Sequence, residues 1–178
     1  MNPTRLEDLD SHSRCLQMGV PRQHFLGAFR ILQPPGLVLI SETSSTRVIP
    51  LDGRPHVPSG IKLWAGDSVG HWEGNTLVVD VTNISDSGWY DWGGNFHSSD
   101  LHLVERWTVV DANTISYEAM NYDPKVFTRP WKLKNRYVRS KNANADAASG
   151  EDSCYEGEKD IDVMLFHNSQ EAEKDQKK

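Results

Sequence analysis

The sequence has few cysteines, no long apolar run and no excess of positive charge. Its two cysteines, Cys15 and Cys154, stand in no CxxC or Cys/His pattern, so a zinc site is not expected. They either form a disulfide or are two buried thiols. The longest apolar stretch, residues 36–40, is far shorter than the roughly 20 residues that span a bilayer. The net charge of −6 argues against nucleic acid or an anionic membrane as a partner, because both need a basic face.

Several enzyme motifs are missing as well. There is no GxSxG elbow, no glycine-rich phosphate loop and no GxGxxG sequence after a strand. The seven histidines show no HxH, HExxH or HxxxH spacing, so no metal or other cofactor is expected. The first eight residues lack the apolar core of a signal peptide. We therefore expect a soluble protein whose compartment the sequence leaves open.

What the sequence does contain is a regular series of short apolar stretches with turn residues between them. Gly74-Asn75 suits a two-residue hairpin turn with positive φ, and Asp111-Ala112-Asn113 joins a second hairpin. Eight strands with short links, and no long amphipathic helix, favour an all-β antiparallel barrel of the lipocalin (calycin) type. The expected strands are residues 25–32, 36–41, 46–51, 68–73, 76–84, 101–110, 114–122 and 127–139.

Composition divides the chain into four parts. Residues 1–24 are polar and irregular, and residues 25–140 carry the strands of the barrel domain. From Lys141 the sequence becomes linker-like, and residues 141–168 are expected to pack on the barrel as an extension. Residues 169–178 are almost all polar or charged, which predicts a disordered tail.

Glu105 is the first candidate for chemistry. Side chains alternate along a strand, so Glu105 shares a face with the apolar residues Leu103 and Trp107. A carboxylate in that position either pairs with a cation, such as Arg129, or has a raised pKa that suits a general acid or base.

Asp80 and His97 are the candidate partners of Glu105. Asp80 lies on the mixed face of the 76–84 strand, which either lines a cavity or faces solvent. His97 ends an aromatic loop and is either a proton carrier, because histidine titrates near neutrality, or a surface residue.

The loop over residues 88–97 carries four aromatic side chains among glycines. They either cap a pocket and stack on a flat ligand, or fold back over the core. We expect Tyr90 to act as a proton donor. The expected ligand-binding residues are Trp89, Trp92, Phe96, Tyr117, Arg129 and Trp131.

Several stretches resemble a family of uncharacterised, often exported bacterial proteins, most specifically WEGNTLVV at 72–79 and TRPW at 128–131. The resemblance implies a β-rich domain and, for exported members, a disulfide between Cys15 and Cys154. It supplies no reaction. Family members usually carry Cys-His-Glu-Gly where this chain has Cys154-Tyr155-Glu156-Gly157, which weakens any site built on that histidine. The further stretches that resemble the family are RCL at 14–16, GVPR at 19–22, DGRPH at 52–56, GH at 70–71, ER at 105–106 and DP at 123–124.

These features predict a cofactor-independent acid–base enzyme, a lyase, isomerase, cyclase or epoxide-opening hydrolase, acting on a small hydrophobic or aromatic molecule. In this hypothesis one carboxylate accepts a proton while His97 or Tyr90 donates one. The alternatives are a non-catalytic small-molecule-binding barrel and a structural interaction domain. A homodimer is compatible with the sequence.

Overall fold

The computed structural model describes residues 9–14, 16–25, 28–42 and 45–141. Cys15 and Cys154 lie outside these ranges, as do the extension beyond Lys141 and the tail over residues 169–178. The expected disulfide, extension and tail therefore stay predictions. Within the described ranges, no helix has the length and apolar character needed to cross a membrane.

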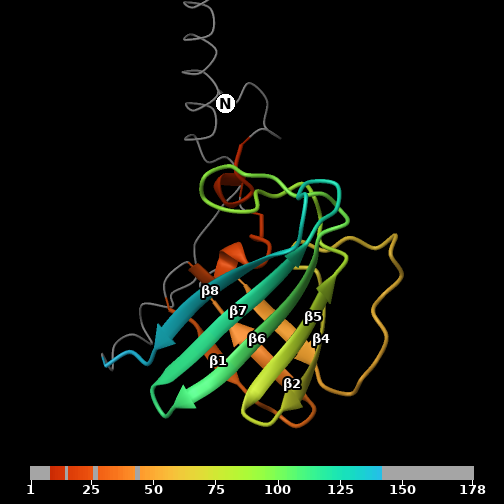
Figure 1. Ribbon diagram of the computed structural model, residues 1–178. Helices are drawn as coiled ribbons and strands as arrows, with labels where there is room; N and C mark the ends of the chain where they lie inside the picture. Colours follow the sequence, from red (N-terminus) through yellow and green to blue (C-terminus); the bar gives the residue numbers. More distant parts are fainter. Residues whose placement is uncertain (1–8, 15, 26–27, 43–44, 142–178) are drawn as a thin grey trace, which may run out of the picture.

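In the part of the chain that the structure describes, eight strands form two antiparallel sheets (Figure 1). The smaller sheet has the order β1-β2-β3, with β1 (Arg30–Leu32), β2 (Leu37–Ser41) and β3 (Thr46–Pro50). The larger sheet runs in sequence order from β4 to β8. Its strands are β4 (Asp67–Glu73), β5 (Thr76–Thr82), β6 (His102–Asp111), β7 (Thr114–Tyr122) and β8 (Trp131–Val138).

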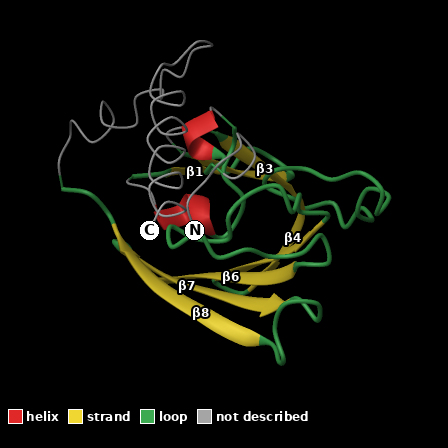
Figure 2. Cartoon of the chain, turned by 90° about the horizontal axis from the view of Figure 1, so that it is seen from above, coloured by secondary structure: helices red, strands yellow, loops and turns green. Residues whose placement is uncertain are grey.

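The helices among the described residues are two short 3-10 turns, η2 (His12–Arg14) and η3 (Arg22–Phe25). Seen from above, the five-stranded sheet curves along one side of the molecule and the small sheet lies across from it (Figure 2). The all-β, antiparallel prediction is confirmed. The described strands form two open sheets rather than a closed barrel, so the lipocalin-like type stays a prediction.

Strand ends follow the local chemistry. Six of the eight strands match the expected ranges within about two residues, because apolar alternation and turn residues mark them clearly. β8 begins at Trp131 rather than at residue 127, since Pro130 has no N–H to donate to a ladder. The preceding residues turn back instead, with the Phe127 N–H donating to the Asp123 carbonyl at 2.8 Å.

The hairpin between β4 and β5 turns at Gly74, whose φ is +61°, as the sequence predicts. Asn75 joins this turn to the next strand. Its side-chain amide donates to the Val109 carbonyl at 2.7 Å, and its own carbonyl accepts from the Val109 N–H at 3.0 Å. The hairpin thereby sets the register of β6.

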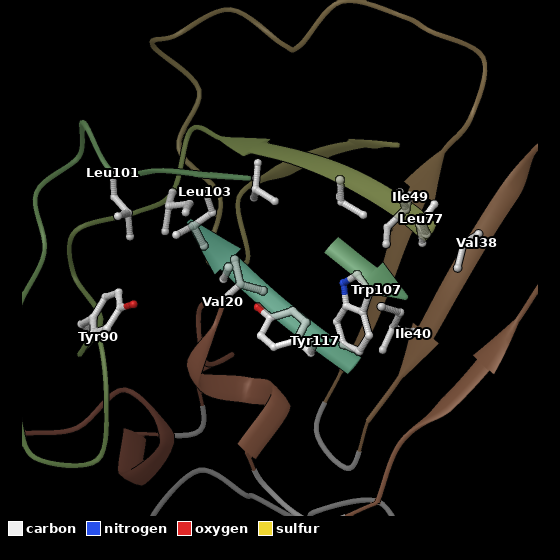
Figure 3. Packing of buried hydrophobic residues seen from close by; sticks show 14 residues of the cluster. Val20, Val38, Ile40, Ile49, Leu77, Tyr90, Leu101, Leu103, Trp107 and Tyr117 are labelled. Atoms are coloured by element: carbon white, nitrogen blue, oxygen red, sulfur yellow. The ribbon is translucent and has the colours of Figure 1, made fainter. Parts of the chain in front are cut away.

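The two sheets meet where β3 lies against β4. Gly70 permits this approach, because a Cβ there would lie 2.7 Å from Cγ2 of Ile49. The inward-facing residues of both sheets then form one core (Figure 3). Its fully buried members include Val20, Val38, Ile40, Ile49, Val79, Leu103, Tyr117 and Ala119.

Candidate functional site

A groove of about 930 Å³ opens between the ends of the two sheets. Ile31 and Ile40 line it from the small sheet, and three aromatic rings form much of its wall. The Trp107 and Tyr137 rings are stacked with centroids 5.8 Å apart, and Phe29 meets them edge-on at 5.7 and 4.8 Å. Such a wall suits the face of a flat apolar molecule.

The rim of the groove is apolar and exposed. Leu32, Trp72, Val109 and Val138 come from four different strands, and each is between 41% and 63% exposed. Single exposed apolar residues are ordinary on a protein surface. Four of them around one groove form an exposed apolar rim, a feature that is common at binding sites.

The wall also contains one unused hydrogen-bond donor. Trp107 is 3% exposed, and its indole N–H has no partner among the described residues. A buried donor without a partner carries a desolvation cost of about 1–3 kcal/mol. An acceptor on a bound molecule, where it can reach this N–H, would remove that cost.

Behind Trp107 lies a buried charge cluster of His24, Glu42, Arg47 and Glu105. Glu105 is 0% exposed and bonds Arg47 Nη2 at 2.5 Å, so its partner is Arg47 rather than the exposed Arg129. His24 Nε2 lies 3.3 Å from Glu105, and His24 Nδ1 lies 2.5 Å from Glu42. Two basic and two acidic side chains thus lie within 3.3 Å of their partners, and each is at most 5% exposed.

The pKa values in this cluster reflect that pairing. Burial by itself would raise the pKa of Glu105, but the Arg47 and His24 charges hold it well below its usual range. Burial would lower the pKa of His24, yet its bonds to Glu105 and Glu42 raise it above 6.5. The Tyr117 hydroxyl donates to Glu105 at 2.7 Å, and burial together with that carboxylate raises the pKa of Tyr117.

The cluster therefore holds Glu105 ionised and enclosed. None of its four residues lines the groove. The His24 ring packs edge-on against Trp107 at 4.9 Å, so the cluster positions the groove wall from behind.

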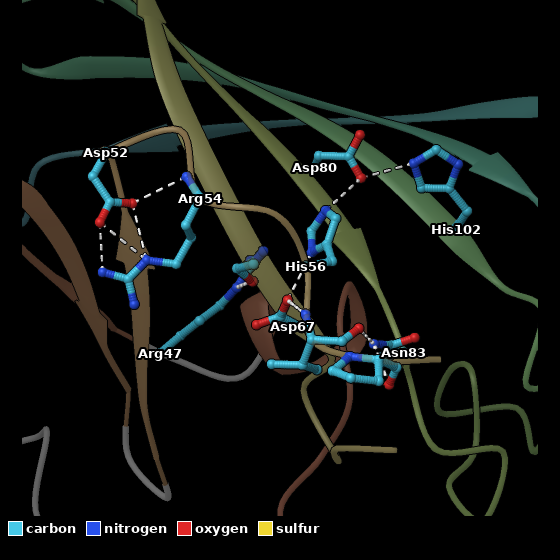
Figure 4. A network of polar contacts seen from close by, with 11 residues as sticks. Arg47, Asp52, Arg54, His56, Asp67, Asp80, Asn83 and His102 are labelled. Carbon is cyan, nitrogen blue, oxygen red and sulfur yellow. Dashed lines mark hydrogen bonds and ion pairs between the residues drawn. The ribbon is translucent and has the colours of Figure 1, made fainter. Parts of the chain in front are cut away.

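Asp80 belongs to a second cluster, the surface His–Asp cluster of His56, Asp67, Asp80 and His102 (Figure 4). His102 Nε2 and His56 Nε2 lie 2.9 and 3.3 Å from the same Asp80 oxygen. His56 Nδ1 lies 2.8 Å from Asp67, which also accepts from the Val57 N–H at 3.0 Å.

This cluster is open to solvent. The four side chains are between 21% and 48% exposed. Asp67, Asp80 and His102 come from the outer face of β4, β5 and β6, and His56 comes from the loop between β3 and β4. The described residues include no three His, Cys, Asp or Glu side chains placed to hold a metal ion. What the arrangement offers is a half-exposed carboxylate placed between two imidazoles.

The aromatic loop lies at the opposite end of the sheets from the groove (Figure 1). Trp92 stacks on Arg22, whose guanidinium lies 4.0 Å from the ring centroid and also pairs with Asp10. Trp89 lies farther from the same guanidinium, at 6.0 Å. Phe96 is 69% exposed. The loop packs on the N-terminal segment and contributes no side chain to the groove.

Tyr90 and His97 are the buried members of this loop, at 6% and 5% exposed. The Tyr90 hydroxyl donates to Asn121 at 2.6 Å, and burial raises the pKa of Tyr90. His97 Nδ1 lies 3.1 Å from the Ser98 carbonyl. Trp131 packs against the Tyr90 ring at 5.7 Å. The expected site residues are therefore divided among three places, and Glu105, Asp80 and His97 do not converge.

Sequence reasoning missed several residues that the structure brings together. His24 and Arg47 come from an irregular segment and a short strand, where no pattern signals a role. His102 could have been found, because the hairpin register sets Asp80 opposite Val104 and alternation then places His102 on the same face.

No protein-family model, curated protein or solved structure matches the chain.

Proposed function

We propose that the protein binds a small apolar molecule, with an aromatic ring as its central feature, in the groove between the two sheets. In this proposal the sheets form a lipocalin-like container and the binding is not catalytic. The observation that carries it is the groove of about 930 Å³ walled by Phe29, Trp107 and Tyr137.

The size and chemistry of the groove support this function. Pockets for small molecules generally have volumes of about 300–1,000 Å³ and are mostly apolar with a few polar groups. Burying apolar surface contributes about 25 cal/mol per Å², and an aromatic pair adds about 0.5–1.5 kcal/mol. The buried indole N–H of Trp107 has no partner among the described residues, so a ligand with a carbonyl or ether oxygen that reached this atom would gain one polar contact.

The positions of the acidic and basic groups favour binding over proton transfer in this groove. Glu105 and His24 pair with each other behind the wall, and the loop that carries Tyr90 and His97 lies at the other end of the sheets. A molecule in the groove meets aromatic and aliphatic side chains before it meets any of these four.

The test is a fluorescence titration of the full chain with N-phenyl-1-naphthylamine. Ile31→Trp places a larger side chain in the groove, and we expect it to weaken binding about tenfold or more. Ile61→Trp makes the same change in an exposed loop and should leave the affinity unchanged. Equal binding by both variants, each with the unfolding midpoint of the parent, would exclude the groove as the site.

A second proposal rests on Asp80. A half-exposed carboxylate between two imidazoles could serve the acid–base chemistry of a lyase, isomerase, cyclase or epoxide-opening hydrolase. The test is product formation from a panel of hydrophobic epoxides and β-hydroxy carbonyl compounds. Asp80→Asn should lower the rate about 10²–10⁴-fold, and Asp111→Asn should not. Undiminished turnover by Asp80→Asn would refute this assignment.

A further inference from the structure

The chain leaves the larger sheet at the mouth of the groove. β8 ends at Val138, and Arg139 and Ser140, which follow it, both line the groove. Residues 142–178 therefore begin beside the opening. Any apolar part of this segment that lies within reach has an apolar site next to its point of attachment.

One short part of the segment is apolar. Residues 161–166 read Ile-Asp-Val-Met-Leu-Phe, whereas the rest of residues 142–178 is mainly polar or charged. Nineteen residues, 142–160, separate this run from the end of the described chain. By the random-coil relation, 19 residues span roughly 25 Å, which is enough to reach back to the groove.

The distribution of charge also favours contact between residues 161–166 and the groove. Residues 142–178 contain ten acidic and four basic residues. The groove has the opposite balance, because Arg30, Arg136 and Arg139 line it together with a single acidic residue, Asp111. Asp160 and Asp162 flank the start of the apolar run, so its burial would bring two carboxylates to this arginine-rich mouth.

We propose that residues 161–166 bind in the groove of their own chain and cover the aromatic wall. The apolar side chains of this run replace solvent at the exposed rim, and Asp160 and Asp162 face the arginines. Because the segment is tethered, its effective concentration at the groove is in the millimolar range, so even modest contacts keep it bound. A small molecule must then displace it. This docking requires the groove, but it does not require that the groove also binds a small molecule.

The direct test places the photoreactive residue benzoylphenylalanine at position 165 of the full chain. After irradiation, mass spectrometry should find cross-links within one chain to groove residues such as Ile31, Trp107 and Tyr137. The same residue at position 176, beyond the apolar run, is the matched control and should not label the groove. Cross-links to another surface, or between two chains, would overturn the proposal.

A second test measures competition. The full-length double variant Leu165→Asp, Phe166→Asp should bind N-phenyl-1-naphthylamine about tenfold more tightly, because the run no longer covers the groove. Asn168→Asp with Gln170→Asp adds the same charge outside the run and should change nothing. Cross-linking to the groove without any probe binding would refute the small-molecule function alone. Probe binding with equal affinity in all variants, and cross-links elsewhere, would refute the docking alone.

Discussion

The buried charge cluster and the surface His–Asp cluster use the same side-chain chemistry on opposite faces of one sheet. Glu105 pairs in register with Val79 and faces the core, whereas Asp80, one residue farther along β5, pairs with Val104 and faces outward. Each carboxylate meets a histidine and at least one further charged or titratable group. A shift of one residue along a strand thus decides whether a carboxylate is buried in the core or exposed to solvent.

The comparison between the two clusters shows where electrostatic interactions are strong. Inside the protein the low dielectric strengthens each interaction, so removing one partner leaves a costly unpaired charge. At the surface, water screens the same interaction to less than about 1 kcal/mol. We therefore expect the buried cluster to contribute much more to the free energy of unfolding than the surface cluster, whose charges are screened by water and salt.

Removing Glu105 should produce the largest effect. Glu105→Gln leaves Arg47 and His24 without the shared carboxylate, and we expect it to lower the free energy of unfolding by about 3–5 kcal/mol. Urea denaturation measures the change. Glu118→Gln is the matched control, since Glu118 pairs with two lysines at the surface and should cost less than about 1 kcal/mol. Equal losses in both variants would show that the buried cluster is no more strongly coupled than a surface ion pair.

The pH dependence of stability should be the next largest effect. The raised pKa of His24 adds stability that is complete below about pH 6.5 and is lost as the pH rises through the folded-state value. The lowered pKa of Glu105 adds stability that is complete above about pH 4.5 and is lost at lower pH. Together these two groups predict that the free energy of unfolding is highest between about pH 4.5 and pH 6.5.

Above pH 6.5, the loss from His24 should reach up to about 1.4 kcal/mol per pH unit. Urea denaturation at several pH values measures this slope. His24→Gln should remove it, whereas His71→Gln, an exposed control, should keep it. A slope that persists in His24→Gln would assign the effect to another group.

Changing Asp80 should have the smallest effect on folding. Asp80→Asn removes the charge between His56 and His102, but because all three are partly exposed we expect a change below about 1 kcal/mol. The unfolding midpoint in urea measures it. A loss above 2 kcal/mol would mean that the surface cluster is as strongly coupled as the buried one.

The sequence predicts the strands well and the clusters poorly, for one physical reason. The position of a strand depends mainly on residues that are close together in the sequence. The alternation around Glu105 and the turn at Gly74 can therefore be recognised in the sequence alone. The clusters depend on contacts across long separations. His24, in η3, and Glu105, in β6, are 81 positions apart in the chain and meet only in the folded protein.

The aromatic loop shows a second limit of sequence reasoning. Aromatic residues among glycines are typical of both a pocket cap and a packed lid. In the structure the partner of Trp92 is Arg22, which no local pattern connects to the loop. The aromatic wall of the groove comes instead from Phe29, Trp107 and Tyr137, whose rings are isolated in the sequence.

Asn83 carries a consequence for the choice of expression host. It adopts a φ of +58°, is buried, and uses its side-chain nitrogen to donate to the Val57 carbonyl at 2.8 Å. Asn83-Ile84-Ser85 is also an acceptor sequence for N-linked glycosylation. A glycan on that nitrogen and the folded loop exclude each other, because the sugar occupies the atom that holds the loop. A eukaryotic secretory host would therefore yield native protein only from chains that fold before the sugar is attached.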